Sequence, residues 1–219
     1  EKSKHSALSF RHFVLGTVAI FIYVGVEVGI PNFANLFMTS PEINIDPTIA
    51  GSVVGTYWFL MMIGRLCGAS IGAKVSSRAM LTVVSTVGIA LVLGAIFCAD
   101  NILVNMPVFK SDISFGFAQV PVNVMLLILC GLCTSVMWGG IFNLAVEGLG
   151  KYTAAASGLF MVMVCGGGIL PLIQGGVADF AGFLNSYWVI ALGLAYILFY
   201  AAIGSKNVNT DIPTDDYEA

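Results

Sequence analysis

The chain has 219 residues, of which 58% are hydrophobic and only 10% are charged, and its formal net charge is −3. Soluble domains carry about 25% charged residues. With a mean hydropathy of +0.94, this composition excludes a soluble domain and indicates a polytopic helical membrane protein. The sequence also lacks the large basic patch that nucleic-acid binding requires.

The first predicted span, 13–38, carries an acid in an apolar run. A charge at membrane depth costs roughly 2.5–3.5 kcal/mol on insertion scales, so Glu27 indicates a functional site. Tyr23, Glu27, Pro31 and Asn35 recur at intervals of four and form one drifting helical stripe. Pro31 also frees a backbone carbonyl. The stripe predicts the wall of a polar cavity; the alternative is that Glu27 is a structural hydrogen-bonding group between helices.

Five more apolar runs follow, and they predict the spans 48–73, 79–99, 121–146, 153–178 and 183–204. The segment 100–120 is more polar, and we expect it to be a loop. The predicted organisation is a lead-in at 1–12, a six-helix transmembrane domain at 13–204 and an acidic tail at 205–219.

The positive charges are divided unequally between the two predicted sides of the membrane. Only Lys110 lies on the side opposite the termini, and the other basic residues lie on the side of the termini: Lys2, Lys4, Arg11, Arg65, Lys74, Arg78, Lys151 and Lys206. Because positive charge favours the cytoplasmic side, both termini are expected to be cytoplasmic.

A faint internal repeat relates the two halves of the predicted domain. Ala50-Gly51 aligns with Ser157-Gly158, and Gly68 aligns with Gly175 at the same offset. An odd number of spans separates the copies, so they would be inverted in the membrane, as in the three-plus-three repeats of some transporters.

The five cysteines lie in or beside apolar spans, and Cys130-x-x-Cys133 has the spacing of a redox or zinc pair. It lacks flanking histidines or further cysteines, so small buried hydrophobes are the favoured interpretation. No predicted span contains a histidine, and no nucleophile–base pair is visible. We therefore expect no metal, no cofactor and no enzymatic activity.

Four motifs together suggest a family. The run Phe-x-Leu-Ala-x-x-Gly-Leu-Gly-x-x-Thr at 142–153 and the run Gly-Gly-x-Ile-x-Pro-Leu-x-Gln-Gly within 166–179 resemble helices ten and eleven of the fucose:proton and glucose/galactose permeases of the major facilitator superfamily. Tyr23-Val-Gly-x-Glu27 resembles their seventh helix. Tyr57-Trp58 followed by Gly64-Arg65-x-x-Gly68 resembles their eighth.

The resemblance covers nearly all of 13–204 in order. It implies an all-α membrane protein whose six transmembrane helices form one half, a 3+3 inverted repeat, of a major facilitator transporter. The family has twelve helices, so the implied partner is an amino-terminal six-helix half, which holds most of the acids used for proton coupling. The implied function is proton-coupled symport of a monosaccharide of the fucose, glucose or galactose type, by alternating access, in the bacterial inner membrane. Where helix ten of these permeases usually has a proline, this chain has glycine at Gly139-Gly140, which leaves the sugar open.

The expected sugar-binding residues combine one carboxylate, three amides and two indole rings: Glu27, Asn32, Asn35, Trp58, Trp138 and Asn143. Amides pair with hydroxyls as donor and acceptor, and an aromatic face stacks on a sugar ring. Each of these residues also has a plain packing interpretation. Arg65 and Glu147 are expected to form a gating ion pair at the cytoplasmic edge.

Two alternatives stay open. The first is a major facilitator transporter of a non-sugar solute, such as an organic acid or a drug; a cationic residue lining the cavity would favour an anionic substrate, and none is expected at mid-membrane. The second is a non-transporting membrane receptor or scaffold, against which Glu27 and the glycine-rich helices argue.

Overall fold

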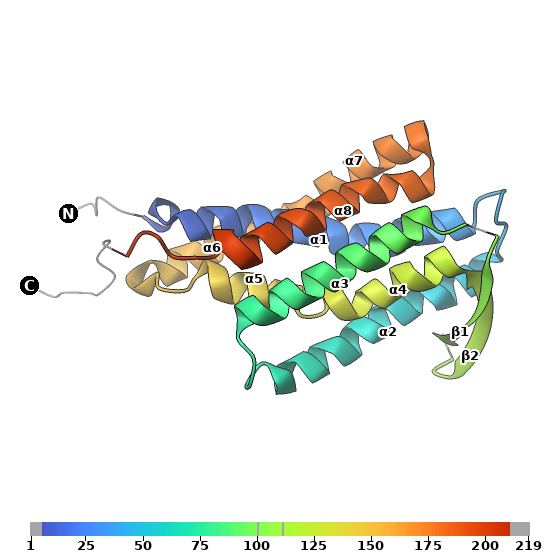
Figure 1. Cartoon of the computed structure of the whole chain (residues 1–219), viewed down its shortest axis with the longest axis horizontal. Helices are drawn as coiled ribbons and strands as arrows, with labels where there is room; N and C mark the ends of the chain where they lie inside the picture. Colours follow the sequence, from blue (N-terminus) through green and yellow to red (C-terminus); the bar gives the residue numbers. More distant parts are fainter. Residues whose placement is uncertain (1–5, 100, 111, 211–219) are drawn as a thin grey trace, which may run out of the picture.

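A computed structural model describes residues 6–99, 101–110 and 112–210 of the chain. Within these residues, six helical segments are long and apolar enough to cross a membrane, and they run side by side in an elongated bundle (Figure 1). A short 3₁₀ turn, η1 (Ala7–Ser9), precedes the bundle. The uninterrupted long helices are α1 (Arg11–Met38), α2 (Pro47–Ile71), α3 (Ser77–Phe97) and α8 (Phe183–Phe199), which continues into a π-helical turn, η4 (Tyr200–Gly204).

The fourth and fifth predicted spans are each broken into two helices. The fourth consists of α4 (Val122–Thr134) and α5 (Met137–Ala145), separated at residues 135–136. The fifth consists of η2 (Gly150–Tyr152), α6 (Thr153–Val162), the 3₁₀ turn η3 (Met163–Cys165) and α7 (Gly166–Ala181). The six span positions agree with the sequence prediction to within a few residues, but the sequence did not indicate these breaks.

Capping residues explain where two of the helices begin. Asp46 accepts a hydrogen bond from the Thr48 amide at 2.8 Å, and Pro47 occupies the first helical position of α2. Ser76 accepts one from the Ala79 amide at 3.2 Å at the start of α3. Local sequence therefore sets where α2 and α3 each begin.

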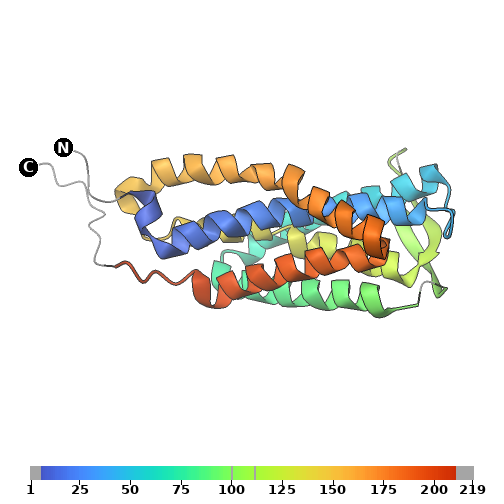
Figure 2. The ribbon, with the colours of Figure 1, turned by 90° about the horizontal axis from the view of Figure 1, so that it is seen from above.

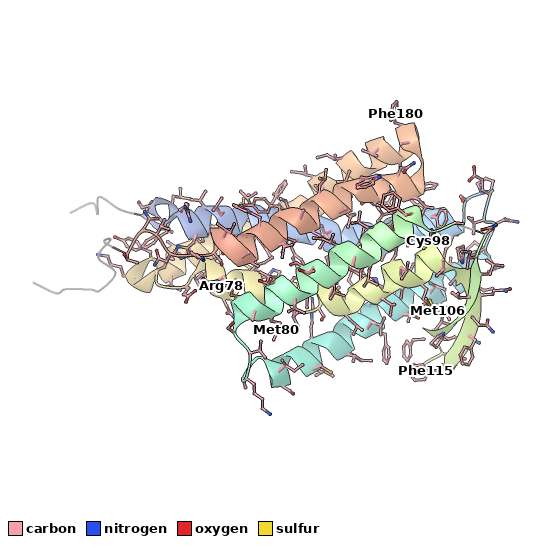
Figure 3. The ribbon with its side chains drawn as sticks, in the orientation of Figure 1. Arg78, Met80, Cys98, Met106, Phe115 and Phe180 are labelled. Atoms are coloured by element: carbon pink, nitrogen blue, oxygen red, sulfur yellow. The ribbon has the colours of Figure 1, made fainter. Side chains whose placement is uncertain are left out.

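The polar segment between α3 and α4 is not a simple loop. It forms an antiparallel β-hairpin of β1 (Leu103–Phe109) and β2 (Phe115–Pro121), which corrects the expectation that this segment is a loop. Its inward side chains Met106, Val108, Ala118 and Val120 are buried, and its outward ones are exposed, as the two-residue strand period requires. Phe115 lies at the tip of the hairpin (Figure 3), where its exposed ring meets the Phe59 ring of α2 edge-on with 5.5 Å between centroids.

The turn end of the hairpin is attached to α2. The Phe109 amide donates to the Thr56 hydroxyl at 2.9 Å. The Phe109 ring stacks on Phe59 with 4.7 Å between ring centroids. These contacts fix the hairpin against the flank of α2 rather than leaving it free.

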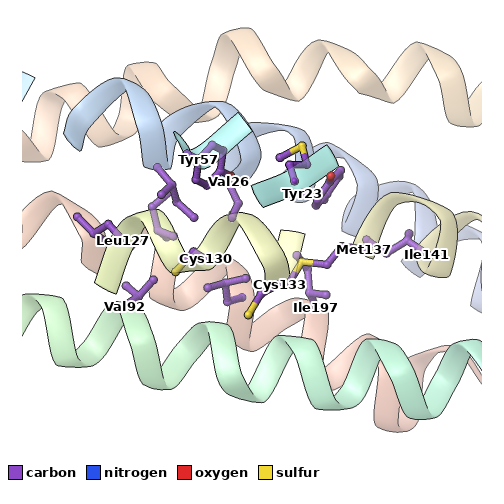
Figure 4. Packing of buried hydrophobic residues seen from close by; sticks show 14 of the residues in the cluster. Tyr23, Val26, Tyr57, Val92, Leu127, Cys130, Cys133, Met137, Ile141 and Ile197 are labelled. Atoms are coloured by element: carbon purple, nitrogen blue, oxygen red, sulfur yellow. The ribbon is translucent and has the colours of Figure 1, made fainter. Parts of the chain in front are cut away.

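Helix α1 is the central element of the bundle. It contacts α7, α8, α5, α4 and α2, and Figure 2 shows it between the α6–α7 segment and α8. Its approach to α7 is close because Gly166 lies directly against the Phe21 carbonyl, where a Cβ atom would overlap the backbone. Buried apolar side chains of α1, α2, α3, α4, α5 and α8 fill the interior (Figure 4).

The start of α1 and the end of α8 lie at the same end of the bundle (Figure 1). The Arg11 amide donates to the Asn209 side-chain oxygen at 2.9 Å, which ties the two segments together. Six spans thus return the chain to the side from which it entered, as the sequence predicted.

Candidate functional site

An ion pair joins the middle of α1 to α2. The Arg65 guanidinium lies 3.4 Å from a carboxylate oxygen of Glu27. The Glu27 side chain is 17% exposed, whereas that of Arg65 is 57% exposed. The carboxylate is therefore largely enclosed by protein, and the guanidinium projects from α2 into open space beside it.

This geometry corrects the expected partner of Arg65. Among the described residues, the ion pair of Arg65 is with Glu27, and Glu147 is not within ion-pair distance of it. The reason is position along the bundle: Arg65 lies inside α2, level with Glu27, whereas Glu147 lies beyond the end of α5. There the Glu147 carbonyl accepts a hydrogen bond from the His12 ring at 2.7 Å.

The carbonyl freed by Pro31 has a defined partner. Proline lacks an amide hydrogen, so the carbonyl four residues earlier, that of Glu27, has no helical donor. The Tyr57 hydroxyl donates to it at 3.1 Å. The same hydroxyl lies 3.1 Å from the Thr134 hydroxyl, and the Tyr23 hydroxyl donates to the Thr134 carbonyl at 3.0 Å. Both tyrosines are fully buried, so the backbone groups at these helix irregularities are satisfied by side chains.

A pocket of about 550 Å³ opens between α2, α3 and the α4–α5 break. Three residues expected from the sequence line it: Arg65, Trp138 and Asn143. Its walls also include residues of α2, α3 and the α4–α5 break, namely Gly68, Ser77, Leu81, Ser135 and Val136. We call it the Arg65 pocket. Its volume is in the range of small-molecule sites.

Trp138 has a packed side and an open side. Its ring stacks on Phe142 with 5.5 Å between centroids and meets Phe160 edge-on at 5.7 Å. It is half-buried and also lines the Arg65 pocket. The packing and binding interpretations of this residue are therefore compatible.

Asn143 lies at the rim of the pocket. Its amide nitrogen donates to the hydroxyl of Ser77, the first residue of α3, at 3.4 Å. It also lines a second pocket of about 660 Å³ together with Arg78 and Glu147. The residue is exposed.

The structure does not bring Asn32, Asn35 and Trp58 to the Arg65 pocket. Exposure varies along the α1 stripe: Tyr23 and Pro31 are buried, Glu27 is half-buried and Asn35 is exposed. Asn32 is exposed as well, and Trp58 is 43% exposed while packing edge-on against Tyr57. These three side chains face outward from the six-helix bundle.

Sequence reasoning gave no site role to Tyr57, Thr134, Ser135 and Ser77. Two signals were available: a tyrosine in an apolar run needs a partner for its hydroxyl, and Pro31 leaves one carbonyl without a donor. Ser135 is fitted against Gly64, where a Cβ atom would overlap its side chain.

Within the described residues no group of three or more His, Cys, Asp or Glu side chains is placed to hold a metal, and Cys130 and Cys133 are buried free thiols in the core (Figure 4).

The fold matches solved transporter structures. No family model matches the chain. A major facilitator transporter solved in an outward conformation superposes with a TM-score of 0.75 at 23% identity, covering 90% of this chain and 43% of that one. A substituted form of the fucose:proton symporter of Escherichia coli superposes with a TM-score of 0.77, covering 94% of this chain and 46% of that one. The six-helix bundle is therefore one half of a major facilitator fold.

Sequence relatives identify the family. A glucose/galactose transporter of Brucella abortus is 31% identical over 208 residues, covering 94% of this chain and 46% of that protein. A putative glucose/galactose transporter of Helicobacter pylori is 32% identical, covering 94% and 47%, and the L-fucose-proton symporter of Escherichia coli is 23% identical, covering 90% and 40%. The chain belongs to this family of multi-pass membrane transporters, as their carboxyl-terminal half. It spans about half the length of the curated relatives it matches.

Proposed function

We propose that this chain is the carboxyl-terminal half of a proton-coupled monosaccharide symporter of a bacterial inner membrane, with both of its ends cytoplasmic. An amino-terminal six-helix half would complete it. The observation that carries the proposal is the Glu27–Arg65 ion pair at the edge of a pocket that also exposes Trp138 and Asn143.

The chemistry of the pocket suits a neutral, hydroxyl-rich ligand. A carboxylate accepts hydrogen bonds from hydroxyls, a guanidinium donates them, and an amide does both. Because Glu27 and Arg65 compensate each other, the pair adds polar contacts without adding net charge. The indole of Trp138 offers an apolar face to the C–H side of a sugar ring. The names of the relatives, which mention glucose, galactose and fucose, support the same substrate class.

Asn32, Asn35 and Trp58 have a role in the same proposal. They are exposed on α1 and α2, the two helices that carry Glu27 and Arg65. In the complete transporter the substrate cavity would lie between the two halves, and these side chains would contact sugar from there. Glu27 would bind sugar hydroxyls and serve as a secondary proton site, while the main coupling acids would lie in the other half.

The test is uptake into proteoliposomes that contain the complete transporter. Labelled D-glucose, D-galactose and L-fucose are each offered with and without an inward proton gradient. The proposal predicts accumulation of at least one of them that collapses when the gradient is dissipated. The proposal would be contradicted if none of the three sugars is transported by preparations that a thermal unfolding transition shows to be folded.

A second candidate function rests on Arg65. Its guanidinium lines the pocket and is more exposed than its carboxylate partner, so it could meet an anionic solute. Galacturonate added to the same uptake series separates the two candidates. Uptake of galacturonate in preference to galactose would favour an anion transporter.

A further inference from the structure

Two irregular points of the helix backbone face each other inside the bundle. One is the Glu27 carbonyl on α1, which has no helical donor because of Pro31. The other is Thr134, the last residue of α4, after which the chain breaks before α5 begins at Met137. Both points lie next to the proposed site, since Glu27 pairs with Arg65 and the break residues Ser135 and Val136 line the Arg65 pocket.

A single hydroxyl group joins these two points. Tyr57 of α2 is fully buried, and its hydroxyl donates to the Glu27 carbonyl at 3.1 Å while lying 3.1 Å from the Thr134 hydroxyl. Figure 4 shows its ring on the same side of α4 as Tyr23, whose hydroxyl donates to the Thr134 carbonyl at 3.0 Å. Three helices thus meet at one hydrogen-bonded junction, and the side chains of Tyr23, Tyr57 and Thr134 that form it are buried.

We propose that Tyr57 is a positioning residue for substrate binding, an inference that rests on the proposed function. Its hydroxyl holds the turn of α1 that carries Glu27 in register with the α4–α5 break. That break sets where Trp138 and Asn143 lie across the Arg65 pocket. The two walls of the site belong to different helices, so a shift of one against the other misplaces groups that must contact the same ligand.

Loss of the hydroxyl has a specific consequence at this position. The Glu27 carbonyl has no hydrogen-bond donor within α1, and in Tyr57→Phe it also loses its donor from α2. A buried unpaired carbonyl is costly, so the Pro31 turn and the α4–α5 break are expected to rearrange to find another partner. The rearrangement changes the distance between Glu27 and the α5 residues.

Tyr187 provides a matched control, because its hydroxyl also donates to a carbonyl of α1. It is also fully buried, and its hydroxyl donates to the Ile30 carbonyl of α1 at 2.7 Å. Within an α-helix the Ile30 carbonyl is also the acceptor for the amide four residues later, that of Ala34. Tyr187→Phe therefore removes a tyrosine–α1 hydrogen bond without leaving a carbonyl unpaired and without touching Glu27 or Thr134.

The first measurement is sugar affinity. The complete transporter and its Tyr57→Phe and Tyr187→Phe variants are titrated with D-glucose, D-galactose and L-fucose, with intrinsic tryptophan fluorescence as the readout. Tyr57→Phe is expected to weaken binding by about tenfold, the effect of one lost buried hydrogen bond, and Tyr187→Phe by no more than about twofold. Thr134→Val, which removes the other partner of the same hydroxyl, is expected to weaken binding in the same direction. Equal affinities for wild type and Tyr57→Phe would overturn the inference.

The second measurement needs no sugar. Spin labels at positions 129 and 151, in a cysteine-free background, report the distance between α4 and the segment after α5 by electron–electron resonance. The inference predicts a broader distribution in Tyr57→Phe than in wild type or Tyr187→Phe. If the wild type binds none of the three sugars, the proposed function fails, and this distribution alone decides whether Tyr57 holds the break. An unchanged distribution in Tyr57→Phe would overturn the inference whatever the sugars do.

Discussion

The Arg65 guanidinium of α2 lies 3.4 Å from the Glu27 carboxylate of α1, and this is an ion pair between two predominantly apolar helices. A lone charge at this depth would be costly, and pairing with a partner reduces that cost. Because Arg65 is the more exposed partner, it is the one free to turn toward a ligand while Glu27 stays held by the α1 backbone.

The first prediction concerns this pair. Breaking a buried pair costs about 3–5 kcal/mol, but Arg65 is mostly exposed, so we expect Arg65→Ala to lower stability by only about 1–2 kcal/mol. Arg65→Ala, Glu27→Gln and the double variant are compared by thermal unfolding in detergent. The double variant should lose less than the sum of the single losses, which is the signature of a direct interaction.

The control is a second double-variant cycle, in which Glu147 instead of Glu27 is tested as the partner of Arg65. Arg65→Ala and Glu147→Gln should give additive losses, because the structure places these side chains in separate environments. Coupling between Arg65 and Glu147 with additivity between Arg65 and Glu27 would reverse the assignment of the ion pair.

The second prediction tests the aromatic wall of the Arg65 pocket. Trp138→Leu keeps an apolar side chain but removes the ring, so sugar binding should weaken by roughly three- to tenfold. Trp188→Leu is the matched control, since Trp188 packs edge-on against Phe97, with 5.6 Å between ring centroids, and is not among the pocket walls. Equilibrium dialysis with labelled sugar measures both. Equal losses in the two variants would remove Trp138 from the site.

The third prediction concerns the close fit of α2 against α4. A Cβ atom at Gly64 would overlap Ser135, so Gly64→Ala should lower stability by about 1–3 kcal/mol, the usual cost of overpacking. Gly51→Ala meets nothing within 4 Å and should be neutral or slightly stabilising. Thermal unfolding compares the two, and the loss in Gly64→Ala should shrink when Ser135→Gly is added. No rescue by Ser135→Gly would mean that the two helices do not meet there.

The fourth prediction fixes the orientation of the bundle. Because the side with β1 and β2 carries a single basic residue, Lys110, we expect that side to be extracytoplasmic. Single cysteines at positions 110 and 151, in a cysteine-free background, are labelled in intact cells with a membrane-impermeant reagent. Position 110 should react and position 151 should not; the opposite pattern would invert the topology.

Much of the fold could be predicted because apolar length alone identifies a membrane span. The breaks at 135–136 and at η3 could not, since glycine and serine within an apolar run are compatible with either a continuous or an interrupted helix. The hairpin was missed because Pro107, the charged tip and the short strands hide the two-residue alternation that buries Met106 and Val108.

Three residues named from the sequence, Arg65, Trp138 and Asn143, line the Arg65 pocket, whereas the pairing of Arg65 with Glu27 was not predicted. Periodicity places Glu27 and Asn35 on one drifting stripe, and neither of these two side chains is fully buried in the structure. The partner of Arg65 depends on how far α2 is shifted along α1. The amino-acid sequence predicts each helix separately and does not specify this shift. The motif that contains Tyr57 was recognised as resembling the eighth helix of the family. The hydrogen bond from Tyr57 to the Glu27 carbonyl is known only from the packed structure.

The fifth prediction tests the central claim, that Glu27 belongs to the substrate and proton pathway of a sugar symporter. In the complete transporter, Glu27→Gln keeps the shape and hydrogen-bonding capacity of the side chain and fixes it as neutral. The measurement is sugar transport by this variant in proteoliposomes, as exchange across the membrane and as accumulation driven by a proton gradient. We predict that exchange persists with modestly weakened affinity while accumulation fails. Wild-type accumulation and affinity in Glu27→Gln, and equally in Glu27→Ala, would contradict the claim.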